Sequence, residues 1–398
     1  MLKHNKAANV QLDRILLYSA LIGLMVLHTE EVPLLHMVCS VLRAISFVLL
    51  FPQLIVRKKK LEWFHYILIA YFFLLLYSSI INGQRLNGLI SKAITIFTIL
   101  AALKIDFEKN VNQTLRTLTV VFSGFVIVNF FLVLLYPDGI WKHVSDVTGE
   151  IVGDYILGGN RNQMGSVLVV GYLTSTLYSL KTKRLRKLNY IIMLSALISL
   201  LIGGSRTSIL GMIGISLFNY SKSERIHNMA LLFMIIGYFV FQFVAVFLLT
   251  DFSSNHYISY FVEEVLGKDL TFSGRSGIWE QSTLLILLSP IWGYGLYDSD
   301  FLMFNISTIS PHNFILSILL KGGICLLICA LILFAFAIKQ AYKYKTSMSL
   351  MLIFGLWILL FMSIMEVYSF ILYVYLLSLL NYSKFFCLKK TLVNNKIK

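Results

Sequence analysis

The sequence predicts an all-α, polytopic integral membrane protein with about twelve transmembrane helices in one membrane domain over residues 1–398. Hydrophobic residues make up 58% of the chain and charged residues 13%, whereas a soluble domain carries about 25% charged residues. The mean hydropathy of +0.79 also excludes disordered and collagen-like classes. The apolar segments are continuous, which argues against a membrane β-barrel with its alternating strands.

Twelve apolar segments are candidates to cross the membrane as helices. The first ends in Leu27-His28-Thr29-Glu30, which lacks the small residues of a signal-peptidase site, so we expect it to be retained. Several segments are shorter than the ~20 residues of a straight crossing. The segments are 13–29, 34–56, 61–81, 87–103, 115–136, 164–180, 188–204, 207–221, 229–250, 313–337, 348–366 and 369–387.

The distribution of charge predicts the orientation in the membrane. The formal net charge is +15, from 34 basic and 19 acidic residues. When the N-terminus is placed in the cytoplasm and the spans alternate, most basic and few acidic residues fall on the cytoplasmic side, as the positive-inside rule requires. We therefore expect a multi-pass protein of the plasma (inner) membrane with both termini cytoplasmic. The basic charge is a topology signal, and we expect no nucleic-acid partner.

Residues 251–312 are predicted to form a large extracytoplasmic loop between the ninth and tenth spans. Within it, the apolar run Leu284 to Leu288 is too short to cross the membrane. Together with Ile278 and Trp279 it predicts a helix on the outer membrane surface, which Pro290 ends. A long loop with its own helix is usually functional in a compact protein.

Four basic residues on the outer side predict an anion site: Arg161, Arg206, Arg275 and Lys321. A guanidinium group binds phosphate oxygens with two parallel hydrogen bonds. Glycines flank Arg206 and Arg275, which lets backbone amides approach a ligand, and both arginines fall near expected helix N-termini. The alternative is that each arginine extends to the interface or pairs with an acidic residue.

His312 is the candidate general base. It lies between Pro311 and Asn313 at the start of an expected helix, with Lys321 on that helix. Imidazole titrates near neutral pH, which suits proton transfer there. An isolated outer histidine is more often a hydrogen-bonded surface residue, so the neighbouring arginines are what favour the catalytic interpretation.

No metal site or cofactor is predicted. His28, Glu30 and His36 could compose a metal site, but their spacing matches no standard ligand pattern. Cys325 and Cys329 share one helix face, where packing is the expected role.

An ordered series of motifs between about 157 and 340 resembles the O-antigen ligase and polysaccharide polymerase family of bacterial membrane glycosyltransferases. The first 150 residues add little to this resemblance. The motifs are Asn160-Arg161-Asn162, Gly204-Ser205-Arg206, Gly274-Arg275 followed by Trp279, Pro290-Ile291-Trp292-Gly293-Tyr294-Gly295, and Pro311-His312-Asn313.

The resemblance implies a fold similar to the GT-C type of integral-membrane glycosyltransferase and a metal-independent, inverting transfer. It also implies that the protein polymerises oligosaccharide repeat units linked to undecaprenyl diphosphate into capsular polysaccharide, exopolysaccharide or O-antigen, at the outer face of the plasma membrane. The implied partners are the lipid-linked glycan donor and acceptor, the lipid bilayer, a flippase and a chain-length regulator. The implied catalytic residues are His312, Arg206 and Arg275, and the candidate substrate-binding residues are Arg161, Asn160, Asn162, Lys321, Gly274, Gly293 and Gly295.

Two alternatives remain open. A ligase of the same family would transfer the glycan to lipid A core or protein instead of a second lipid-linked unit. A lipid-linked oligosaccharide flippase or another transporter would use charges inside the membrane, for which Arg43 and Glu366 are candidates. The simpler interpretation of these two residues is a buried ion pair.

Overall fold

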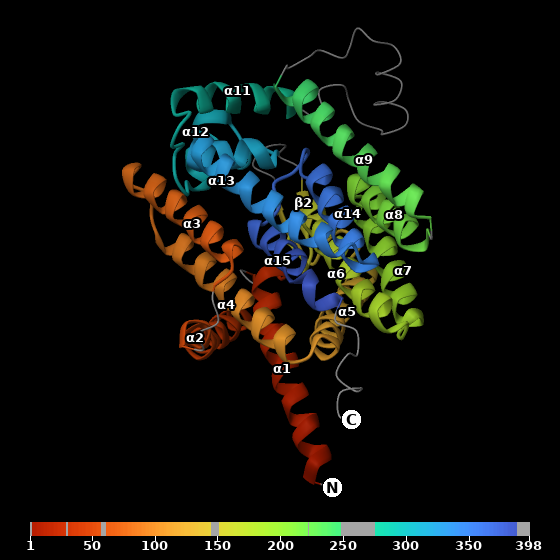
Figure 1. Cartoon of the computed structure of the whole chain (residues 1–398). Helices are drawn as coiled ribbons and strands as arrows, with labels where there is room; N and C mark the ends of the chain where they lie inside the picture. Colours follow the sequence, from red (N-terminus) through yellow and green to blue (C-terminus); the bar gives the residue numbers. More distant parts are fainter. Residues whose placement is uncertain are drawn as a thin grey trace.

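The computed structural model describes residues 2–28, 31–56, 61–144, 151–221, 223–247 and 275–387. Within these residues the chain is almost entirely helical, and its strands form one two-stranded sheet (Figure 1). The structure thus confirms the all-α, polytopic membrane class.

A helix occupies the position of each predicted span. Seven helices of the described residues are long and apolar enough to cross a membrane: α2, α3, α4, α5, α7, α9 and α13. Among the others, α8 is short, α6 carries many polar residues, and α14 and α15 are shorter apolar helices. The helices are α1 (Leu2–Val26), α2 (Pro33–Val56), α3 (Trp63–Ile81), α4 (Asn87–Lys109), α5 (Val111–Leu135), α6 (Arg161–Thr182), α7 (Arg186–Gly203), α8 (Arg206–Tyr220), α9 (Glu224–Phe241, continued by a π-helical turn Gln242–Phe247), α13 (Phe314–Tyr344), α14 (Ser347–Met362) and α15 (Phe370–Asn381, followed by a 3-10 turn Tyr382–Phe386).

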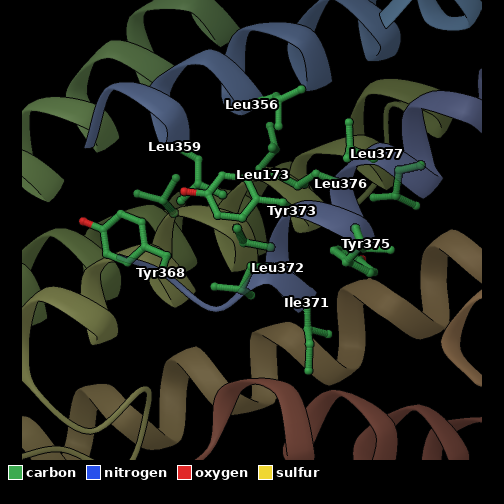
Figure 2. Packing of buried hydrophobic residues seen from close by; sticks show 14 of the residues in the cluster. Leu173, Leu356, Leu359, Tyr368, Ile371, Leu372, Tyr373, Tyr375, Leu376 and Leu377 are labelled. Atoms are coloured by element: carbon green, nitrogen blue, oxygen red, sulfur yellow. The ribbon is translucent and has the colours of Figure 1, made fainter. Parts of the chain in front are cut away.

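The core is centred on α6, α14 and α15. The helices α14 and α15 are apolar around most of their circumference, and all three helices bury most of their side chains, as expected for helices surrounded by other helices. Figure 2 shows Leu173 of α6 between Leu356 and Leu359 of α14 and Tyr373 of α15. In contrast, α2 and α9 leave most of their apolar side chains exposed, which suits contact with lipid.

Two helices of the loop predicted to be extracytoplasmic lie at the opposite end of the molecule from the start of α1: α11 (Arg275–Leu288) and α12 (Ser299–Ile306) (Figure 1). The first confirms the helix predicted to end before Pro290. Its Trp279 is fully buried against the protein, whereas Leu288 on another face is 80% exposed. Its contact with the membrane surface stays a prediction, and the loop residues 251–274 lie outside the described residues.

The segment between α5 and α6 contains the antiparallel hairpin of β1 (Trp141–Val144) and β2 (Ile151–Asp154), in which Trp141 is opposite Asp154. Its strands precede α6, and Gly158 donates a backbone hydrogen bond to Val26 of α1. This connection fixes the chain just before the N-terminus of α6.

The helix α13 is broken at Gly322 and Gly323, where φ is −146° and +60°. The turn after α11 fills the break: Tyr294 N donates to Leu320 O at 2.7 Å, and Ile324 N donates to Pro290 O at 2.8 Å. The turn thus pairs backbone groups that the break leaves without helical partners, which non-helical backbone at membrane depth requires.

Candidate functional site

The candidate site is built around the N-terminus of α13. Asn313 caps this helix by accepting a hydrogen bond from Leu316 N at 3.1 Å. Its side-chain amide donates to Gln242 Oε1 and to Ile364 O, and the residue is fully buried. His312, just before the cap, has a left-handed backbone with φ of +46°. The buried Asn313 cap therefore fixes the backbone from which the His312 imidazole extends.

Glu366, between α14 and α15, is the partner of His312. The distance from His312 Nδ1 to Glu366 Oε1 is 3.2 Å. The same oxygen accepts from Val367 N at 3.1 Å, and Oε2 accepts from Asn162 Nδ2 at 3.1 Å. The carboxylate is only 7% exposed, and a buried carboxylate is stable only when such donors replace water.

The environment of Glu366 favours its ionised form. Burial opposes ionisation, but the hydrogen bond and charge of His312, the charge of Arg275 and the Val367 amide outweigh it and hold the pKa of Glu366 below its ordinary value. An ionised Glu366 accepts hydrogen bonds only, so it favours the tautomer with the proton on His312 Nδ1. The Nε2 atom is then the acceptor, on a side chain that is 23% exposed.

Hydrogen bonds also attach the N-terminus of α6 to the segment that carries Glu366. Asn160 caps the helix by accepting from the amides of Asn162 and Gln163, each at 3.0 Å. The Gln163 side chain donates to Val367 O at 2.7 Å. These bonds explain why Asn162 meets Glu366, although the two residues are far apart in sequence.

Each of the three predicted site arginines is the first residue of a helix: Arg161 of α6, Arg206 of α8 and Arg275 of α11. Ser205, just before Arg206, donates to Asn162 Oδ1 at 3.5 Å, so α8 begins beside the N-terminus of α6. The Arg161 guanidinium lies 4.0 Å from where a Cβ on Gly204 would be. Helix N-termini carry partial positive charge and amide donors, so adjacent ones favour an anionic ligand.

The predicted site residues fall into two groups. In the first group, Asn162 and His312 hydrogen-bond Glu366, and the charge of Arg275 acts on it. Asn160 and Arg161 lie beside Asn162 at the start of α6, and Arg206 follows Ser205, which bonds Asn162. The other group, Lys321, Gly293 and Gly295, lies at the α13 break, where Gly295 N donates to Lys321 O at 2.9 Å.

Both glycines of the second group have a structural role at the break. The backbone φ is +62° at Gly293 and +76° at Gly295, and a Cβ on either would clash with neighbouring backbone. Their substrate contacts stay a prediction, and Gly274 lies outside the described residues.

Sequence reasoning missed the role of Glu366, and the suggested buried pair of Arg43 with Glu366 is wrong. Arg43 Nη1 instead donates to Ser91 Oγ at 2.8 Å and Thr95 Oγ1 at 3.1 Å, both on α4. His312 precedes α13 and Glu366 follows α14, and Phe314 N donates to Ser363 O at 3.0 Å, so the two residues lie at the same end of these helices. An acidic residue at the end of an apolar segment was the available signal, since such a charge needs a partner.

Within the described residues, no group of three or more His, Cys, Asp or Glu side chains could hold a metal ion. His28 lies 3.7 Å from Asp154 of β2, and Glu30 of the alternative metal site lies outside those residues. Cys329 is buried and donates weakly to Ile67 O at 3.6 Å, consistent with packing.

Residues 191–331 match a family model described as O-antigen ligase. The match runs from α7 into α13 and contains Arg206, Arg275 and His312. No curated protein matches the chain. The match confirms the family resemblance, and with the helical architecture it supports membrane glycan processing of the ligase or polymerase type by a glycosyltransferase-like enzyme.

Proposed function

We propose that this chain, with its O-antigen ligase segment at 191–331, polymerises oligosaccharide repeat units carried on undecaprenyl diphosphate. The product would be capsular polysaccharide, exopolysaccharide or O-antigen, made at the outer face of the plasma membrane. The observation that carries this proposal is the hydrogen bond between His312 and the buried Glu366, beside three helix-opening arginines. A positioned base next to a phosphate-binding set is what transfer from a lipid diphosphate requires.

The proposed reaction is a direct displacement at the anomeric carbon. The acceptor hydroxyl attacks from the face opposite the diphosphate, and its proton moves to His312 Nε2. The bond between the anomeric carbon and the phosphate oxygen breaks, and its electron pair leaves with undecaprenyl diphosphate. Glu366 stabilises the imidazolium that forms through Nδ1–H. One displacement inverts the anomeric configuration.

Arg206 and Arg275 are proposed to stabilise the negative charge that develops on the leaving diphosphate. Arg161 would bind the same group beside the start of α8. The charges of these residues and the two adjacent helix N-termini all favour an anion at one place. Because the diphosphate is already a good leaving group, the proposed reaction uses no metal.

The direct test uses purified protein and one lipid-linked repeat unit. A polymerase produces a ladder of products that grow by one unit, whereas a flippase produces no new glycosidic bond. An absence of any transferred product, with the protein folded and in lipid, contradicts the proposal.

A ligase is the second candidate, because the matching family model is described as O-antigen ligase. The same assay with lipid A core as the acceptor separates the two. Transfer of one preassembled glycan to the core, without a ladder on the lipid-linked unit, would favour the ligase.

The proposed sidedness is tested by labelling single cysteines in intact cells. We expect positions in α11 and α12 to react from outside, and positions 181–187 and 339–345 to react only after permeabilisation. The excess of basic residues on the second set motivates this expectation. The opposite labelling pattern would put the lipid-linked substrate on the wrong side of the membrane.

A further inference from the structure

The hairpin of β1 and β2 carries an aromatic ring, a carboxylate and an imidazole on one of its faces. Side chains alternate between the two faces of a strand, so Trp141 and His143 share a face and Lys142 lies on the other. Asp154 is opposite Trp141 in the register, which puts it on the face of Trp141. Consistent with this register, His143 Nδ1 lies 3.3 Å from Asp154 Oδ2.

His28, which follows α1, joins these three side chains. Its Nε2 atom lies 3.7 Å from the same Asp154 Oδ2, and its ring meets the Trp141 ring edge to face, with centroids 5.9 Å apart. His28 N donates to Ile156 O at 2.8 Å, so the backbone fixes where this imidazole starts. The four residues Trp141, Asp154, His28 and His143 form the hairpin cluster.

The hairpin cluster is accessible from the surface. The His143 side chain is exposed, whereas Trp141, His28 and Asp154 are half-buried. The half-buried groups are held in place by their neighbours and still present part of their surface to solvent. A bound molecule can therefore contact the indole and the polar groups around it together, which is how a few fixed polar groups orient a ligand.

The hairpin cluster adjoins the N-terminus of α6. A Cβ on Gly159 would lie 3.1 Å from His28 Nδ1, so this imidazole packs against the backbone just before the Asn160 cap. Tyr155, which follows Asp154, donates its backbone N–H to Gly159 O at 2.6 Å. The hairpin and the start of α6 are therefore held to each other by backbone contacts.

The start of α6 also leads directly to the His312 site. Asn162 donates to Glu366 Oε2 at 3.1 Å, and Glu366 Oε1 lies 3.2 Å from His312 Nδ1. Residues 160–162 thus join the two places in one short stretch of chain. A substrate that reacts at His312 and extends past the start of α6 reaches the hairpin cluster.

The side chains of the hairpin cluster match a sugar ring. A pyranose has a face of C–H groups, which packs against an aromatic ring, and a rim of hydroxyls. Those hydroxyls donate to a carboxylate and exchange hydrogen bonds with imidazoles. A diphosphate matches less well, because the Asp154 carboxylate would repel it. Phosphate therefore suits the arginines at the helix N-termini, and a sugar suits the hairpin.

We propose that the hairpin cluster is a sugar subsite, which binds a sugar of the lipid-linked glycan away from the bond that breaks. This inference rests on the proposed function, since it takes the substrate at His312 to be a glycan. Contacts with a remote sugar are the same in the bound and reacting states, so they lower KM and leave kcat unchanged. The subsite would thus select repeat units by the sugar they carry at this position.

The first test is binding of the glycan alone. The probe is the free oligosaccharide that mild acid releases from the lipid-linked repeat unit, titrated into the full chain in nanodiscs and followed by saturation-transfer NMR. We expect Trp141→Ala to raise Kd about tenfold, and Trp141→Phe, which keeps an aromatic face, to recover most of the binding. The control Trp63→Ala removes an exposed tryptophan at the start of α3 and should bind as wild type. An equal Kd for Trp141→Ala and wild type would overturn the subsite.

The carboxylate is tested with the same probe. Asp154→Asn should raise Kd about fivefold, because a hydrogen bond to a charged acceptor is stronger than one to a neutral acceptor. The matched control Asp138→Asn neutralises an exposed carboxylate beside the hairpin, which lies 3.8 Å from Lys142, and should bind as wild type. Equal losses in both variants would contradict a specific contact. Binding that EDTA abolishes would assign the hairpin cluster to a divalent cation and also overturn the proposal.

Cysteine labelling covers the case in which these variants do not fold. His143→Cys and Lys142→Cys place a thiol at exposed positions on opposite faces of β1, in a background in which the exposed Cys387 is replaced by serine. Saturating oligosaccharide should slow maleimide labelling of His143→Cys several-fold and leave Lys142→Cys unchanged. No protection, or equal protection at both positions, would contradict a sugar on the Trp141 face.

Activity separates the subsite from the proposed function. With polymer formation measured against the concentration of the lipid-linked repeat unit, Trp141→Ala should raise KM about tenfold while kcat stays near that of wild type. A lower kcat with unchanged Kd for the oligosaccharide would show that the hairpin only supports α6. A ladder that forms equally well in Trp141→Ala, with unchanged KM, overturns the subsite alone. A wild-type protein that binds the oligosaccharide through Trp141 but transfers nothing contradicts the proposed function instead.

Discussion

The two ends of the helical bundle use charge differently. At the end where α13 and α15 finish, cations pair directly with acids: Lys384 lies 2.6 Å from Glu62, and Lys345 lies 2.6 Å from Glu224. At the other end, the buried Glu366 accepts hydrogen bonds from a histidine and an amide. The first arrangement neutralises charge and joins helices. The second holds a polarised imidazole near arginines, which is the arrangement expected for chemistry.

The largest expected effect is at His312. The His312→Ala substitution removes the proposed base and should lower turnover by about 10²–10⁴-fold. His227 at the opposite end bonds the backbone oxygens of Phe218 and Ser221, so His227→Ala is the control and should keep near-normal turnover. The measurement is polymer formation by equal amounts of each variant in membranes. Equal activities of His312→Ala and His227→Ala would contradict a catalytic role for the end of the bundle that contains His312.

Arginine geometry gives the next effect. Arg206→Lys and Arg275→Lys keep the charge but lose the planar pair of donors for diphosphate oxygens, so each should lower turnover by about 10²–10³-fold. Arg85→Lys, between α3 and α4, should be nearly silent. Near wild-type rates for both site variants, with normal insertion, would mean that these arginines are only interface anchors.

Glu366 is expected to act through His312. Glu366→Gln keeps the shape but removes the charge that fixes the imidazole tautomer, and misplacement of a base costs about 10² in rate. We expect kcat to fall while KM for the donor changes little. A loss of binding with unchanged kcat would show that Glu366 only supports the fold.

The pH dependence of stability gives an independent readout for Glu366. Its folded pKa is lower than the ordinary value of 4.5, because the donors around it outweigh its burial. Its contribution to stability is therefore present above pH 4.5 and is lost as the pH falls through the folded value. The difference in melting temperature between wild type and Glu366→Gln should shrink below pH 4.5. A constant difference at all pH values would contradict a depressed pKa.

The sequence predicts the helices well because each depends on a local property. Apolar content places the spans, and the proline at 290 places the end of α11. Glycine has two uses that the sequence does not separate: Gly293 and Gly295 look like ligand-binding positions, but the structure packs them against backbone. Glu366 meets His312 and Asn162 across 54 and 204 residues of sequence. Such pairing depends on tertiary packing, which no local pattern contains.

A smaller effect is expected at the paired end. Lys384→Met leaves Glu62 with Asn381 as its remaining side-chain donor, at 2.7 Å. The loss of one partner of a partly buried carboxylate should cost about 1–2 kcal/mol of stability. Turnover per folded molecule should be unchanged, because the pair lies at the far end of α15 from His312. Thermal unfolding and turnover, measured on the same preparation, check both parts. A large loss of turnover in the folded variant would show that the two ends are coupled.

The smallest expected effect is that of a chelator. The proposed chemistry uses arginine guanidinium groups and helix N-termini to stabilise the leaving diphosphate, so EDTA should leave the rate of polymer formation unchanged. The measurement compares purified protein before and after EDTA, with and without added Mg²⁺, Mn²⁺ or Zn²⁺. Loss of activity in EDTA that one divalent ion restores would contradict this expectation and assign the metal a role at the diphosphate. His28 and His36 would then be the first positions to replace, since they belong to the alternative metal site. If His28→Ala and His36→Ala variants kept the metal requirement, the ion would instead arrive with the substrate, because a diphosphate itself binds divalent cations and competes with Arg206 and Arg275 for the same oxygens.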